Sequence, residues 1–153
     1  MAELGAIASV IGIAGAGAKL SIACIEFASK IGSAGSEIVA VGTEISQFCV
    51  VLKQIEATLT KAKQTVRYSL TAILAIESIT QQCRPVFQEI ENILDGLNKD
   101  NKEPNFLSRL AWVLKRSKVQ LLRKTLESSK LTLSCMLMTL LFAENIASRK
   151  SVL

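Results

Sequence analysis

The stretch EIVAVGTEISQFCVVLKQIEATLTKAK, residues 37–63, decides the fold class. Its large apolar residues recur at steps of three and four: Ile38, Val41, Ile45, Phe48, Leu52, Ile55 and Leu59. Because an α-helix turns once in 3.6 residues, this spacing places them on one side of a helix. Glu44, Lys53 and Lys61 fall off that stripe. The segment therefore predicts a helix with one buried face.

Helical spacing continues on both sides of this segment. We expect helices at residues 1–31, 36–63, 66–97, 106–116 and 117–150. Pro85 should kink the third helix, because proline lacks the N–H that a helix needs. Residues 95–105, DGLNKDNKEPN, should form a long loop in which Gly96 caps the helix before it. A break near Arg116 would separate the last two helices.

The chain lacks any long window in which apolar and polar residues alternate, the pattern typical of a strand. Its 153 residues suit one domain, residues 1–153, with a core built from aliphatic side chains, because only 5% of the residues are aromatic. The prediction is an all-α fold, an antiparallel bundle of four to five helices whose amphipathic N-terminal helix is rich in glycine and alanine.

Composition argues against an enzyme and against a metal or cofactor site. The sequence contains no histidine, which removes the commonest general base and the commonest metal ligand. Its four cysteines, at positions 24, 49, 83 and 135, are widely spaced and have mostly apolar neighbours. This pattern indicates buried thiols in a reducing cytosol rather than disulfides or zinc ligands. The N-terminus lacks the basic region of a signal peptide.

The sequence GIAGAGAKLS, residues 12–21, resembles a phosphate-binding loop only superficially. Ala18 intervenes before Lys19, and Leu20 stands where the hydroxyl residue of such a loop belongs. On a helix, its small residues instead stack at intervals of four, which permits close helix–helix approach of the kind common in lipid. Glycine costs about 1 kcal/mol per residue in a water-exposed helix, so these glycines need a reason.

Length leaves two interpretations of the first helix open. Leu4 to Ile25 is just long enough to cross a bilayer and is interrupted only by Lys19. The segment could lie in the tight centre of a bundle, or it could move from the bundle into a membrane. In the second case the inserting residues would be Leu4, Gly5, Ile7, Ala8, Ile11, Gly12, Ile13, Gly15, Ala16, Gly17 and Leu20.

Positive charge is concentrated in the last third of the chain. Residues 99–153 hold eleven basic and four acidic side chains. No acidic residue interrupts the group Arg109, Lys115, Arg116, Lys118, Arg123 and Lys124. A solvated face, nucleic acid and anionic lipid are all compatible with such a run. Because Trp112 is the one aromatic residue within it, we favour anionic lipid over nucleic acid. The apolar stretch 131–143 is too short to cross a bilayer, and we expect it in the core.

Two blocks of sequence resemble a known family. The opening LGAIASVIGIAGAGAKLSIACIEFASKIGSAGSEI is similar to the N-terminal helix of fungal HeLo and HeLo-like domains, which begin NLR-type STAND proteins and related cell-death effectors. The later block RLAWVLKRSKVQLLRKTLESSKLTLSCMLMTLL is similar to the final helices of that group. Together the two blocks cover nearly the whole chain.

The resemblance implies a cytoplasmic bundle that oligomerises on activation and inserts its first helix into the plasma membrane. The outcome would be a pore that permeabilises the membrane, and cell death in fungal non-self recognition (heterokaryon incompatibility) or immunity. The implied partners are anionic membrane lipid, further copies of the chain and an NLR-type protein, with no nucleic acid and no enzymatic residue. The alternative is a soluble helical adaptor that oligomerises without entering a membrane. Such domains usually precede a nucleotide-binding domain, a hydrolase or an amyloid motif, so we expect an excised domain or a stand-alone relative.

Overall fold

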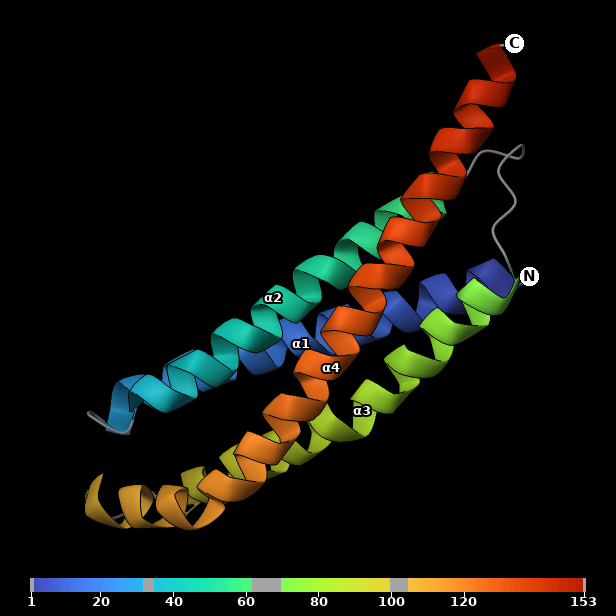
Figure 1. The fold of residues 1–153 in the computed structure, drawn as a ribbon. Coiled ribbons are helices and arrows are strands. Elements are labelled where there is room, and N and C mark those ends of the chain that lie inside the picture. Colours follow the sequence, from blue (N-terminus) through green and yellow to red (C-terminus); the bar gives the residue numbers. More distant parts are fainter. Residues whose placement is uncertain (1, 32–34, 62–69, 100–104, 153) are drawn as a thin grey trace.

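The computed structural model describes residues 2–31, 35–61, 70–99 and 105–152, and within them it contains four helices and no strand. The helices are α1 (Ala2–Ile31), α2 (Gly35–Thr60), α3 (Leu70–Lys99) and α4 (Asn105–Val152). Consecutive helices run in opposite directions (Figure 1). The prediction of an all-α antiparallel bundle is therefore confirmed.

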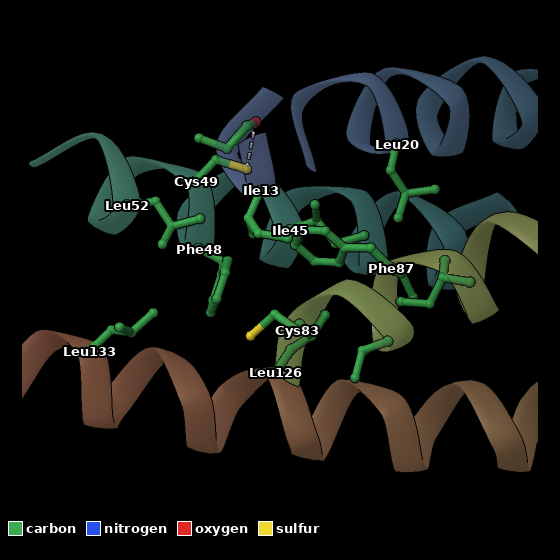
Figure 2. Packing of buried hydrophobic residues seen from close by; sticks show 14 of the residues in the cluster. Ile13, Leu20, Ile45, Phe48, Cys49, Leu52, Cys83, Phe87, Leu126 and Leu133 are labelled. Carbon is green, nitrogen blue, oxygen red and sulfur yellow. Dashed lines mark hydrogen bonds between the residues drawn. The ribbon is translucent and has the colours of Figure 1, made fainter. Parts of the chain in front are cut away.

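In the bundle α1 lies diagonally opposite α4, and α2 lies diagonally opposite α3. Both α1 and α4 pack against α2 and α3, whereas α1 and α4 barely touch each other. The interior is filled by side chains from all four helices, as Figure 2 shows for a part of it. Phe48 of α2 is fully buried there and meets the ring of Phe87 of α3 edge to face, with 5.8 Å between centroids. Burial of this aliphatic and aromatic surface is the main force holding the helices together.

A close approach of α1 to α2 depends on a glycine. A Cβ placed on Gly17 would lie 2.5 Å from the sulfur of Cys49 and 3.0 Å from the ring of Phe87. Two hydrogen bonds join the helices nearby: Ser21 Oγ donates to the carbonyl of Gly42 at 2.8 Å, and the Cys49 thiol donates to the carbonyl of Ala14 at 3.6 Å (Figure 2). Part of the small-residue pattern in α1 is thus explained by packing inside the bundle.

Two expected features of the helix boundaries, the break near Arg116 and the cap at Gly96, are corrected. The structure has one continuous helix, α4, where two helices, 106–116 and 117–150, were expected. No glycine or proline lies near Arg116, so nothing interrupts the helical hydrogen bonds there. Gly96 does not cap α3, which continues to Lys99. Pro85 lies on the exposed side of α3, and the helix continues through it. Residues 62–69 and 100–104 lie outside the described part of the chain.

The cysteines differ from the expectation at one position. Cys24, Cys49 and Cys83 are buried, but Cys135 is exposed on α4. Burial raises the pKa of the three inner thiols, that of Cys24 to about 12. A thiol reacts as its thiolate. Burial therefore slows the reaction of these three thiols with a reagent in two ways, because it blocks access and keeps the thiol protonated.

We therefore expect a single fast alkylation per folded chain. Iodoacetamide at pH 8 should add one group to the native protein and four after unfolding in guanidinium, as measured by intact mass. The Cys135→Ser variant should lose the fast adduct and keep the three slow ones. Two or more adducts forming at the same rate in the folded protein would contradict this placement of the thiols.

Candidate membrane-contacting surfaces

The residues expected to insert into a membrane are divided between two sides of α1. Ile13, Gly17 and Leu20 are buried against the other helices, and Gly5 and Ile7 are half-buried. The remaining six are exposed: Leu4, Ala8, Ile11, Gly12, Gly15 and Ala16. Helical geometry separates them in this way because positions three and four apart share a side of the helix.

The exposed side of α1 is largely apolar from Leu4 to Ile25. We call it the outer face of α1, and it comprises Leu4, Ala8, Ile11, Gly12, Gly15, Ala16, Lys19, Ile22, Ala23 and Ile25. Lys19 is the one charged residue between Leu4 and Ile25, and Glu26 and Lys30 are exposed at the C-terminal end of the helix. Ile22 and Ile25 are each more than half exposed. A helix that is apolar all round is typical of a fully buried or a membrane environment, but in this bundle one side of α1 faces water.

The glycines of the outer face have no packing role comparable to that of Gly17. A Cβ on Gly15 would meet no other atom within 4 Å, and one on Gly12 would meet only Arg84 Nη2, at 3.8 Å. Both glycines line a groove of about 600 Å³ between α1 and α3, and Glu91, Leu94 and Asp95 line it from α3. The cost of these glycines in helix propensity is therefore not offset by contacts within the bundle.

Three helices contain segments long and apolar enough to cross a membrane. By length and composition these are Leu4–Lys30, Gly35–Thr60 and Trp112–Lys150. The first is near the N-terminus, and the third is the least buried of the three within the bundle. The fold is thus compatible with a protein that acts at membranes.

The five basic residues of this group whose side chains the structure describes do not gather on one face. Arg116 and Arg123 point toward α2, where they pair with Glu37 and Glu44, and Lys118 pairs with Glu89 of α3. Lys115 and Lys124 are exposed and have no ion pair among the described residues. The backbone of Arg109 belongs to α4, but its side chain lies outside the described part. The positions 115, 116, 118, 123 and 124 point in several directions because each residue turns the helix by about 100°.

The ion pairs fasten α4 to α2 and α3. Arg116 Nη2 lies 2.6 Å from Glu37 Oε1, and Trp112 Nε1 donates to Glu37 Oε2 at 3.1 Å. Arg123 Nε donates to Glu44 Oε2 at 2.9 Å, and this hydrogen bond lowers the pKa of the Glu44 carboxyl despite its partial burial. Arg116, Lys118 and Arg123 are thus paired with glutamates within the bundle. The assignment of the basic residues to lipid binding stays a prediction.

Sequence reasoning missed a second exposed apolar surface. We expected residues 131–143 in the core, and Leu133, Leu137 and Leu140 are buried there. Leu131, Met138 and Phe142, however, are exposed, so the expectation is wrong for this side of the helix. A signal for it does exist: apolar residues on the solvent side of α4 continue from Leu110 to Ile146 with Lys124 as the one charge.

Comparison with known proteins adds no relative. No family model, curated protein or solved structure matches the chain. The resemblance to HeLo-like domains therefore stays a prediction from the two sequence blocks. Within the described residues, no three His, Cys, Asp or Glu side chains lie close enough to hold a metal ion together.

Proposed function

We propose that this domain is a membrane-targeting cell-death effector of the HeLo-like type. In this proposal the bundle rests in the cytoplasm, assembles into a homo-oligomer after a signal from an NLR-type partner, and inserts α1 into the plasma membrane. The observation that carries the proposal is the outer face of α1, where large aliphatic residues and glycines with no packing role face water.

Among the described residues, no ion pair has to break for α1 to leave, although its apolar packing against α2 and α3 is the most extensive in the bundle. The helix barely touches α4, and no described residue of α1 forms an ion pair with another helix. The ion pairs of the bundle join α4 to α2 and α3 instead. Departure of α1 would therefore leave these three ion pairs intact. It would expose apolar surface of α2 and α3, which further copies of the chain or lipid could cover.

The test is leakage of dye from vesicles after a charge is placed on the outer face of α1. A Gly12→Asp variant should fold, because position 12 is exposed and Arg84 lies beside it. An acidic residue at the centre of a membrane-spanning helix costs about 3 kcal/mol, so leakage from anionic vesicles should fall about 100-fold.

The matched control is Gly12→Ala, which adds a methyl group but no charge. It should leak like the unmodified protein, and circular dichroism should show both variants to be helical. Removal of residues 1–20 should also abolish leakage. If the Gly12→Asp protein leaks at the unmodified rate, insertion of α1 is excluded. Assembly of the unmodified protein in solution with no binding to any vesicle would indicate the soluble adaptor instead.

A further inference from the structure

Exposed apolar residues recur on the solvent side of α4 from Leu110 to Ile146, in two groups separated by Lys124 and Ser128. We call this side the outer face of α4, and its exposed apolar residues are Leu110, Val113, Leu114, Leu121, Leu131, Met138, Phe142 and Ile146. Leu114 is 74% exposed and Phe142 is 67% exposed, so most of each residue faces solvent. Cys135 lies on the same side and is exposed as well.

The face is opposite the buried row of α4. That row contains Trp112, Val119, Leu126, Leu133 and Leu140, seven residues apart in each step. At about 100° per residue, the outer face covers about 120° of the circumference on the other side. This width is typical of a helix that rests on a broad apolar surface, whereas a two-helix seam is narrower.

Charge identifies the surface that fits this face. From Leu110 to Lys150 the helix carries eight basic and two acidic residues. Lys124, which has no ion pair among the described residues, lies within the outer face. Two copies of α4 placed face to face would bring two strongly positive helices together, which is unfavourable. Anionic lipid head groups would be attracted, and long lysine side chains can reach them while the apolar residues enter the acyl region.

We propose that the outer face of α4 docks the folded bundle flat on an anionic membrane, with the helix lying in the plane of the lipid interface. This inference rests on the proposed membrane function, but it assigns the first contact to α4, whereas α1 is the segment proposed to insert. Docking requires no rearrangement, because the face is already exposed and its ion-paired cations remain with Glu37, Glu44 and Glu89.

The first test is flotation of the protein with vesicles. A Leu121→Gln, Phe142→Gln double variant removes two apolar contacts of the face without disturbing the core, since both side chains are exposed. Its binding to vesicles of phosphatidylcholine and phosphatidylserine should weaken at least tenfold. The matched control is Leu70→Gln with Leu74→Gln, two exposed leucines of α3, which should bind within twofold of the unmodified protein.

A probe on the face gives an independent readout. An environment-sensitive fluorophore attached to Cys135 should shift to the blue when phosphatidylserine vesicles are added, and much less with pure phosphatidylcholine. The proposal is overturned if the double variant floats as well as the control, or if the bound protein shows no shift. It is also overturned if the shift occurs without vesicles and grows with protein concentration while sedimentation reports a dimer, because the occupant is then a second copy.

The result is separable from the fate of α1. Normal flotation without any leakage would contradict the proposed insertion and leave docking by α4 intact. Undiminished flotation and leakage in the α4 double variant would contradict docking by α4 and leave insertion intact.

Discussion

Replacing Phe48 by alanine is expected to lower the free energy of unfolding by about 3–5 kcal/mol. The side chain is fully buried in α2 and packs edge to face on Phe87 of α3. Its removal would leave a cavity where α2 and α3 meet, two helices that otherwise do not contact each other closely. Urea denaturation followed by circular dichroism measures the loss.

The matched control is Phe142→Ala, the same substitution on the solvent side of α4. Its ring is largely exposed, so the free energy of unfolding should change by no more than about 0.5 kcal/mol. Equal losses in the two variants would mean that the interior is not where the structure places it.

Substitution of Gly15 and of Gly17 in α1 by alanine should have opposite effects on the free energy of unfolding. Gly17→Ala would bring a methyl group against Cys49 and Phe87, and such overpacking should cost about 1–3 kcal/mol. Gly15→Ala would place the same methyl group in open space and should stabilise the protein by about 0.5–1 kcal/mol, because alanine favours the helix.

Each variant adds one methyl group to α1, and the two positions are two residues apart. Each variant therefore serves as the other's control. Their midpoints in urea should move in opposite directions from that of the unmodified protein. Stabilisation of equal size in both would show that α1 and α2 are not as close at Gly17 as the structure has them. The comparison also measures how much stability Gly15 costs the resting bundle.

The helical fold was predictable because its signal is local. Steps of three and four apolar residues identify each helix, and they predicted the buried side of α2 residue by residue, from Ile38 to Leu59. Boundaries were less predictable. Gly96 and Arg116 looked like points of termination, but a single glycine or a pair of polar residues does not end a helix that tertiary packing supports.

The surfaces were predictable only in part. The sequence indicated an apolar α1 and a basic α4, but it did not reveal which side of each helix is covered. That depends on how a helix is rotated in the bundle, and α1 has apolar residues on every side. The partners Glu37, Glu44 and Glu89 lie on other helices, far from their cations in sequence. No local pattern connects a glutamate of α2 with an arginine about eighty positions later.

The unbroken length of α4 has a mechanical consequence. The helix has 48 residues, about 72 Å at 1.5 Å per residue, whereas α1 has 30 and measures about 45 Å. Leu140 is its last buried residue in the described part, and its C-terminal end projects past the other helices (Figure 1). Because the helix is continuous, a force applied to that end would be transmitted along α4 to the ion-paired residues Arg116 and Lys118. The C-terminal end of α4 and its ion-paired N-terminal half should therefore move as one rigid body.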